Sequence, residues 1–327
     1  MSANLTPEYE KAERRYREAS TDEERLDALR EMLSAIPKHK GTEKMQADIK
    51  RRISQMRKDQ AKKGRGGSKG YDPFHVPKSG VGQVVLIGTP NVGKSMLVAA
   101  TTNASVKVAD YPYTTALPAP GMCRYEDVKI ELVDTPPVTT GHIPGGMVST
   151  IRSADVLCIV LDAAADPLEQ AEIVLGLLEE RSLVLKTVPR DQLDPDNRHA
   201  RSAIIAANKV DIAPPENITT LRELYADGPE ILAISAATGE GLDELRRRLW
   251  ELLAVVRVYT KLPGKPPDHE KPFTLKVGST VEDLARAVHR ELPEKMKFAR
   301  IWGGDRFAGQ QVHRTEVLCD RDIVEIH

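Results

Sequence analysis

The sequence has few of the residues that stabilise secreted or membrane proteins. Its 327 residues include three cysteines, Cys123, Cys158 and Cys319, which are scattered and show no CxxC spacing. Such a set argues against a disulfide framework or a zinc site and is typical of free thiols in a reducing compartment. No apolar run approaches the roughly 18 residues of a membrane span, and the charged N-terminus does not resemble a signal peptide. We therefore expect a cytoplasmic protein with no membrane partner.

Aromatic residues are also scarce, at 4%. The chain has no overall excess of positive or negative charge, because it contains 47 basic and 48 acidic residues. A net charge of -1 predicts no class of partner, so any charged interface must be found locally. The length is sufficient for two or three domains with substantial cores.

The most informative segment is a GxxxxGKS phosphate loop at residues 88–95. An apolar run at 84–87 predicts a buried strand before it, and residues 96–100 predict a helix after it. The glycines allow backbone N–H groups to surround phosphates at a helix N-terminus. Lys94 is expected at the β and γ phosphates and Ser95 on Mg²⁺. The nucleotide-binding residues predicted here are Gly88, Asn91, Val92, Gly93, Lys94, Ser95 and Met96.

Two later segments carry groups that would complete a Mg²⁺ site. Residues 108–115 form a loop rich in hydroxyls, and we select Thr115 as the second hydroxyl ligand, with Thr114 as the alternative. An alternating strand at 129–133 then ends in Asp134, a carboxylate placed to hold the ion through water. We therefore predict Ser95, Thr115 and Asp134 as the metal-binding residues.

Residues 208–211 read NKVD and follow another apolar run, at 203–207. In an α/β sheet, ligands bind at the carboxyl ends of such strands. The carboxylate of Asp211 can accept from both N1–H and the exocyclic amine of guanine, while Asn208 braces the loop and the Lys209 stem covers the base. A further strand at 231–234 leads to Ser235 and Ala236, where a backbone N–H can donate to guanine O6.

The first 79 residues differ in character from this central part. Two apolar stripes, at 26–36 and 45–56, predict a helical hairpin, and residues 7–19 predict a more charged helix before it. Residues 38–69 hold twelve Lys or Arg against three acidic residues. Two interpretations stay open: an RNA-binding arm, which such charge density favours, or a solvated helix face followed by a flexible Gly-rich linker.

Residues 263–267, PGKPP, predict a stiff linker near a domain boundary. Beyond it, a strand at 273–277, a helix capped by Thr280 and Asp283 that runs to Leu292, and short strands at 298–302 and 322–327 predict one helix across a small mixed sheet. No catalytic cluster occurs there. Trp302 and Phe307 are assigned to core packing in preference to a binding surface.

In total, the central domain resembles the Obg-related GTPases, and among them the developmentally regulated GTP-binding proteins. The segments that carry this resemblance are 88–95, 109–117, 134–137, 208–211 and 235–236. A TGS domain follows the GTPase domain in that family, and the segments similar to it are 256–261, 280–284, 297–303 and 322–326. The resemblance implies an α/β fold with a P-loop GTPase domain of mainly parallel sheet and a β-grasp TGS domain. It divides the chain into a basic helical arm and linker (1–79), the GTPase domain (80–256) and the TGS domain (257–327).

The chain departs from the family pattern in the third motif, which usually reads DxxG. Pro137 stands in the position of the glycine whose N–H bonds the γ-phosphate, so discrimination of GTP from GDP is expected to fall. Val138 stands where many small GTPases carry the glutamine that orients water. Some GTPases with an apolar residue there recruit K⁺ through the phosphate-loop Asn, here Asn91. That Asn91 instead only rigidifies the loop is the equal alternative.

Together these features predict a slow, Mg²⁺-dependent GTPase that acts as a molecular switch, with Lys94, Thr115 and Asn91 as the catalytic residues and K⁺ as a second candidate cofactor. The resemblance implies that the protein acts near the ribosome or rRNA, which it would contact through the arm and the TGS domain. We expect no DNA partner. The competing hypothesis is a guanine-nucleotide-gated RNA- or protein-binding module with little or no hydrolysis. In a third interpretation the arm only docks on a protein.

Overall fold

The computed structural model describes residues 6–19, 22–36, 42–63, 73–102, 117–304 and 306–327. The chain divides into two compact units. The first comprises residues 1–75 and 143–152, and the second comprises residues 76–142 and 153–327. Buried hydrophobic residues form a cluster within the first unit and pack against each of the two sheets of the second.

Three helices form most of the first unit: α1 (Pro7–Glu18), α2 (Asp22–Ala35) and α3 (Glu43–Lys63). Thr6 caps α1 by accepting from the Tyr9 N–H at 3.2 Å, and its hydroxyl donates to the Ala35 carbonyl at 3.1 Å. One cluster joins all three helices through Tyr9, Ala12, Leu26, Leu29, Met32, Ile36, Ile49 and Ile53. The predicted helical hairpin is confirmed, and α1 packs against it.

Helix α5 (Met147–Ser153) belongs mostly to this unit as well. The Thr150 hydroxyl donates to the Phe74 carbonyl at 2.6 Å. Gly146 has φ +84°, and a Cβ there would lie 2.5 Å from the Phe74 ring. The chain that follows the arm therefore packs on the segment that follows the third nucleotide motif in the sequence.

The larger sheet of the second unit has the strand order β2-β3-β1-β4-β6-β5, and β7 also pairs with β6, nearer the carboxyl end of that strand than β5. Only β2 is antiparallel to its neighbour, so the sheet is mainly parallel, as expected. Its strands are β1 (Gln83–Ile87), β2 (Ala119–Tyr125), β3 (Val128–Asp134), β4 (Val156–Asp162), β5 (Val184–Lys186), β6 (Ala200–Asn208) and β7 (Ile231–Ala233).

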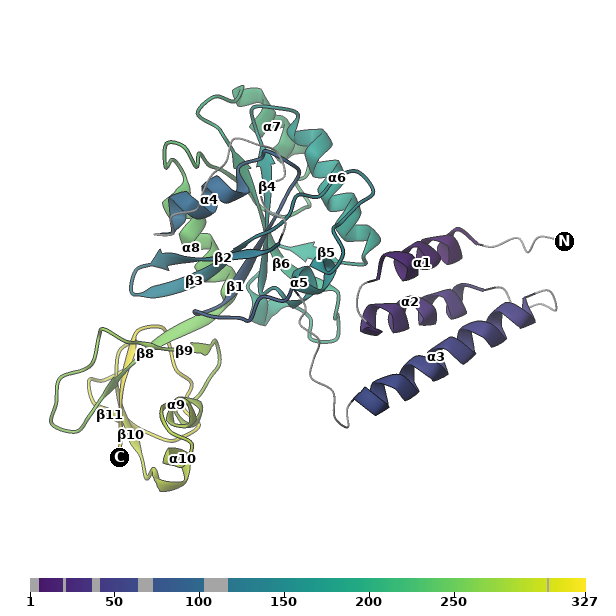
Figure 1. Cartoon of the computed structure of the whole chain (residues 1–327). Coiled ribbons are helices and arrows are strands. Elements are labelled where there is room, and N and C mark those ends of the chain that lie inside the picture. The colour runs from purple at the N-terminus through teal and green to yellow at the C-terminus, as the bar shows by residue number, and fades with distance from the viewer. Residues whose placement is uncertain (1–5, 20–21, 37–41, 64–72, 103–116, 305) are drawn as a thin grey trace. The chain divides into compact units, whose positions relative to one another are not determined.

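Helices cover both faces of this sheet. Leu97 of α4 (Lys94–Thr101) and Leu249 of α8 (Leu242–Leu253) share one cluster with Leu86 of β1. Helices α6 (Pro167–Glu180) and α7 (Pro215–Leu224) follow β4 and β6, and α6 lies across the sheet from α4 (Figure 1). Strands β1 and β4 are buried along nearly their whole length because each has a helical layer on either side.

The smaller sheet has the order β11-β10-β12-β8-β9. Its strands are β8 (Val255–Lys261), β9 (Phe273–Lys276), β10 (Ala299–Trp302), β11 (Gln310–Val312) and β12 (Asp322–Ile326). Helix α9 (Val281–Val288) packs Val281, Leu284 and Ala285 on one face of it. A capping box between Thr280 and Asp283 starts α9, as predicted. This is the expected single helix across a mixed sheet.

Three details of the C-terminal part were predicted wrongly. The helix ends at Val288, and a separate short helix, α10 (Leu292–Lys295), follows, because Pro293 has no N–H for the carbonyl four residues earlier and its ring would clash with that carbonyl in a continuous helix. Residues 263–267 connect β8 to β9 within the sheet and do not lead into it. Phe307 is 87% exposed and therefore lies outside the core. No helix in the described ranges is long and apolar enough to cross a membrane.

Candidate functional site

The phosphate loop connects β1 to α4 at the carboxyl edge of the larger sheet. Each of its two glycines is required for a different steric reason. Gly93 has φ +92°, and a Cβ there would lie 2.3 Å from Nδ2 of Asn208. A Cβ at Gly88 would lie 2.3 Å from the Val160 carbonyl oxygen of β4. Only glycine fits either position, so the loop can lie close to β4 and to the guanine motif.

Lys94 is the first residue of α4 and is 7% exposed. Its ammonium donates to the carbonyls of Gly88 at 2.9 Å and Thr89 at 3.0 Å, which lie in the loop itself. Burial lowers the pKa of Lys94 to about 8, against the attraction of Asp134, which acts to raise it. The Lys94 ammonium is thus held in the loop in a partly desolvated state that disfavours its charge. A bound phosphate anion would offset this unfavourable effect.

The Ser95 hydroxyl donates to Oδ2 of Asp134 at 2.5 Å, so these two predicted metal ligands meet. Asp134 is the last residue of β3 and is 4% exposed. A buried carboxylate beside a hydroxyl at a helix N-terminus is a pair of hard oxygen donors, which fits Mg²⁺ together with phosphate oxygens and water. The third predicted ligand, Thr115, and its alternative Thr114 lie outside the described residues.

The chain after Asp134 is bonded to β1 and the phosphate loop. The Thr135 hydroxyl donates to the Leu86 carbonyl at 2.5 Å, and the Val138 N–H donates to the Gly88 carbonyl at 3.1 Å. Pro136 and Pro137 have no N–H. Of the three residues after Thr135, Pro136 and Pro137 therefore have no amide hydrogen to donate, and the amide hydrogen of Val138 is already bonded to the phosphate loop.

Asn208, 1% exposed, links three segments of the site. Its Nδ2 donates to the Val92 carbonyl of the phosphate loop at 2.9 Å, and its Oδ1 accepts from the Ala236 N–H at 2.9 Å. Since Asn208 itself ends β6, one side chain fixes the phosphate loop, the NKVD loop and the 235–239 loop relative to one another. Each of these buried polar groups is satisfied by another.

Lys209 has φ +69°, and its ammonium donates to Oδ2 of Asp162 at 2.5 Å. Asp162 ends β4 and was not among the predicted residues, although a carboxylate directly after an apolar strand is a signal that could have identified it. The ion pair aligns the Lys209 stem beside the NKVD loop. Asp211 is exposed at the same edge of the sheet, where its carboxylate is accessible to a base.

The 235–239 loop is braced by its own groups. The Ser235 N–H donates to the Glu240 carbonyl at 2.9 Å, and the buried Ser235 hydroxyl accepts from the Thr238 N–H at 3.1 Å. Together with the bond from Ala236 to Asn208, these contacts give Ser235 and Ala236 structural roles in shaping the loop.

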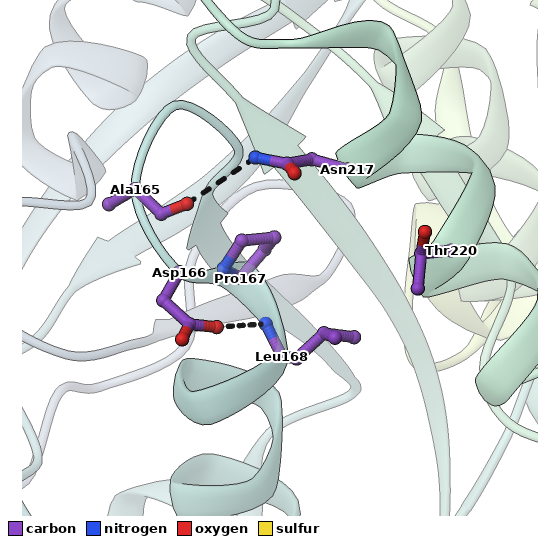
Figure 2. Close-up of a pocket in the computed structure, with 6 residues that line it drawn as sticks. All are labelled: Ala165, Asp166, Pro167, Leu168, Asn217 and Thr220. Atoms are coloured by element: carbon purple, nitrogen blue, oxygen red, sulfur yellow. Dashed lines mark hydrogen bonds between the residues drawn. The ribbon is translucent and has the colours of Figure 1, made fainter.

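A pocket of about 370 Å³ lies beside this edge, between the start of α6 and α7 (Figure 2). Its lining residues are Ala165, Asp166, Pro167, Leu168, Asn217 and Thr220, none of which is a predicted nucleotide ligand. Asp166 caps α6 by accepting from the N–H groups of Leu168 and Glu169. Because a carboxylate already occupies this helix N-terminus, the pocket is unsuited to phosphate, and the phosphate loop remains the candidate site.

Two sequence families match separate parts of the chain. The family described as 50S ribosome-binding GTPase matches residues 83–188, and the TGS domain family matches residues 256–327. These matches agree with the fold and with the phosphate loop, the Ser95–Asp134 pair and the Asn208 bridge. The protein is a P-loop GTPase-domain protein that also carries a TGS domain.

Similarity over nearly the whole chain gives a closer assignment. An uncharacterized GTP-binding protein of Halobacterium salinarum is 29% identical over 93% of this chain and 98% of its own length. Developmentally-regulated G-protein 1 of Arabidopsis thaliana is 28% identical over 93% and 90%. GTP-binding protein 1 of Schizosaccharomyces pombe is 29% identical over 93% and 98%. Over nearly its whole length the chain is therefore similar to developmentally regulated GTP-binding proteins.

Among solved structures, a variant of Aquifex aeolicus Era bound to GDP and aluminium fluoride is 23% identical, covers 69% of this chain and 75% of its own, and has a TM-score of 0.40. The assignment rests on the sequence matches and on the site geometry.

The pKa of Lys94 predicts how nucleotide affinity depends on pH. The free protein loses the Lys94 charge as pH rises through about 8, whereas phosphate binds the charged form, so binding above that pH requires proton uptake. We expect the Kd for GDP to rise about fourfold between pH 7 and pH 8.5, measured by isothermal titration calorimetry. The Lys94→Met variant is the matched control and should bind weakly with little dependence on pH. A wild-type Kd that does not change over this range contradicts the prediction.

Proposed function

We propose that this protein binds GTP and GDP with Mg²⁺, hydrolyses GTP slowly, and acts as a switch that associates with the ribosome or rRNA. The observation that carries the proposal is the Asn208 bridge, which holds the phosphate loop and both guanine-side loops in one arrangement. A generic phosphate-binding loop needs no such link to the NKVD motif. Its presence supports a ligand with both phosphates and a guanine base.

In this proposal the roles are positional, as phosphoryl transfer requires. Lys94 and the loop amides from 88 to 96 hold phosphates, Ser95 and Thr115 ligate Mg²⁺, and Asp134 orients its water. When bound, Mg²⁺ supplies positive charge against the β and γ oxygens. Asp211 selects guanine, and Lys209 covers the base. Since the Ser235 and Ala236 amides are engaged inside the loop, we assign the contact with guanine O6 to the Ala237 N–H.

Potassium is the second proposed cofactor. Asn91 is exposed in the phosphate loop with φ +62°, so its side chain is available to a cation at the nucleotide. Val138 is 1% exposed and apolar, which leaves no side-chain amide at that position to orient water. A cation held partly by Asn91 would stabilise the charge that develops on the leaving phosphate.

The arm is the part of the chain that we propose binds nucleic acid. On α3 the exposed basic residues include Lys44, Lys50, Arg51 and Arg52, opposite the buried Ile49 and Ile53. Asp48 accepts from Arg51 and from Arg52, each at 2.8 Å, and so offsets part of this charge. Even so, Arg51 is 81% exposed and Arg52 is 53% exposed, which leaves both guanidinium groups accessible to phosphates.

Single-turnover hydrolysis of GTP tests the enzymatic part. With excess protein and Mg²⁺, we expect slow cleavage that is faster in KCl than in NaCl at equal ionic strength, because K⁺ adds charge at the leaving phosphate. The Asn91→Ala variant should lose the difference between the two salts, and Lys94→Ala should lose cleavage in both. If bound GTP stays intact in KCl and in NaCl, the competing function of a nucleotide-gated binding module is favoured.

Pro137 supplies the observation that favours that second function. Replacing it by glycine restores an N–H able to bond the γ-phosphate, and a hydrogen bond to a charged group contributes about 1.5 to 3 kcal/mol. Pro137→Gly should therefore tighten binding of a non-hydrolysable GTP analogue by about 10- to 100-fold relative to GDP. Fluorescence titration with both nucleotides measures the ratio, and Pro136→Gly is the matched control. Equal ratios in Pro137→Gly and wild type would refute this role.

Filter binding to rRNA fragments across salt concentrations tests the arm. If its cations bind phosphates, the logarithm of the association constant should fall linearly with the logarithm of the salt concentration. The double variant Arg51→Gln, Arg52→Gln should weaken binding and lower the slope by about two, while Arg17→Gln, Arg30→Gln, on exposed positions of α1 and α2, should change it less. A slope near zero would indicate that the arm docks on a protein instead.

A further inference from the structure

A buried arginine joins the two sheets of the second unit. Arg257 of β8 has a side chain that is 3% exposed. Its Nε and Nη2 bind both carboxylate oxygens of Asp320, at 3.1 and 2.6 Å, and Nη1 donates to Asp127 at 2.8 Å and to Glu126. Asp320 precedes β12 of the smaller sheet, whereas Glu126 and Asp127 connect β2 to β3 of the larger one. A single cation thus binds carboxylates of both sheets.

The carboxylates from the larger sheet form the turn of the β2–β3 hairpin. Tyr125 pairs with Val128, so Glu126 and Asp127 are the two turn residues. Glu126 has φ +51°, a backbone region that glycine or asparagine adopts more easily. Arg321 also donates to Glu126, at 2.6 Å, and the Tyr259 hydroxyl donates to Asp127. Hydrogen bonds from Arg257 and Arg321 lower the pKa of Glu126, which keeps it ionised.

Contacts from α8 complete the cluster. The guanidinium carbon of Arg257 lies 4.8 Å from the centre of the Trp250 ring, and that ring stacks on Tyr125 with a centroid distance of 5.6 Å. Helix α8 leads into β8 through Ala254 alone. The hairpin turn is therefore held from α8, from β8 and from the turn before β12.

The other end of this hairpin lies at the nucleotide site. Ala119, the first residue of β2, pairs with Asp134, the last residue of β3. Asp134 accepts from Ser95, and the segment that carries Thr115 precedes β2 in the sequence. Because seven consecutive residue pairs join the two strands, a shift at one end of the ladder moves the other. The hairpin connects Asp134, a proposed Mg²⁺ ligand, to the Arg257 cluster.

We propose that Arg257 is a positioning residue through which the TGS domain sets the position of the β2–β3 hairpin. The conformation of the TGS domain is thereby coupled to which nucleotide, GTP or GDP, is bound. The inference rests on the proposed binding of both GTP and GDP. A buried ion cluster adds little stability over an apolar contact of the same size, but it is directional and fixes one register. Coupling between two sites is reciprocal, so the nucleotide must alter the cluster as much as the cluster alters nucleotide preference.

The test compares full-length wild type with Arg257→Gln and Asp127→Ala. Asp127 is partly exposed, so its variant is expected to fold even if Arg257→Gln does not. Lys261→Gln is the matched control, since Lys261 lies on the same strand and pairs with Glu325 of the same sheet, away from the hairpin. The first measurement is the ratio of the Kd values for GDP and for a non-hydrolysable GTP analogue.

We expect this ratio to change about fivefold or more in Asp127→Ala and in Arg257→Gln, and to stay at the wild-type value in Lys261→Gln. Hydrogen exchange gives the reciprocal readout. In wild type, exchanging GDP for the analogue should alter amide protection at 255–261 and 320–326, and this response should disappear in Asp127→Ala.

An unchanged ratio in variants that fold, together with no nucleotide-dependent exchange in the TGS domain, would overturn the coupling and leave Arg257 as a structural link. Both readouts need nucleotide binding but no hydrolysis. A wild-type protein that binds neither nucleotide would therefore refute the proposed function itself, which the first titration detects.

Discussion

The site depends on one buried amide. Asn208 donates to the phosphate loop and accepts from the loop at Ala236, and because it ends β6, its position is fixed by the sheet. Gly93 must be glycine to admit that amide, since a Cβ would lie 2.3 Å from Nδ2. The loop that would bind phosphates and the loops that would bind the base are therefore one rigid construction. An unsatisfied amide in this place would cost about 1–3 kcal/mol and would release all three segments.

Around this fixed centre, the segments that would respond to a nucleotide are attached to the rest of the chain by polar contacts. The turn of the β2–β3 hairpin meets Arg257 of the TGS domain, and the chain after Asp134 bonds to the phosphate loop through Val138. Residues 143–152, further along the chain, pack on Phe74, which follows the helices of the arm. The TGS domain thus contacts the hairpin that ends at Asp134, and the chain after the arm contacts the segment that follows the third nucleotide motif, which are the kinds of contact that a nucleotide switch uses.

Much of this was predictable because the informative signals are local. Alternation and apolar runs predicted β1, β3, β6 and β7, and the pair Thr280 and Asp283 predicted the start of α9. The apolar stripes of the arm predicted its packing, since Ile49 and Ile53 are buried as their spacing indicated. The predicted end of α9 was wrong because Pro293 cannot continue a helix from Val288, so the chain begins a new short helix, α10, at Leu292. Asp162 was missed because its partner Lys209 lies 47 residues away.

The sequence by itself determined the kind of site, because GxxxxGKS and NKVD each bring their chemistry within a few consecutive residues and need only a strand before them. It also determined that Pro137 offers no N–H, whatever the fold. Only the tertiary structure decided that Asn208 holds Val92, 116 residues earlier, and that Arg257 meets Asp127, 130 residues earlier. Such contacts depend on how strands are ordered in the sheets and on which buried charges find partners, and neither is encoded in a local pattern.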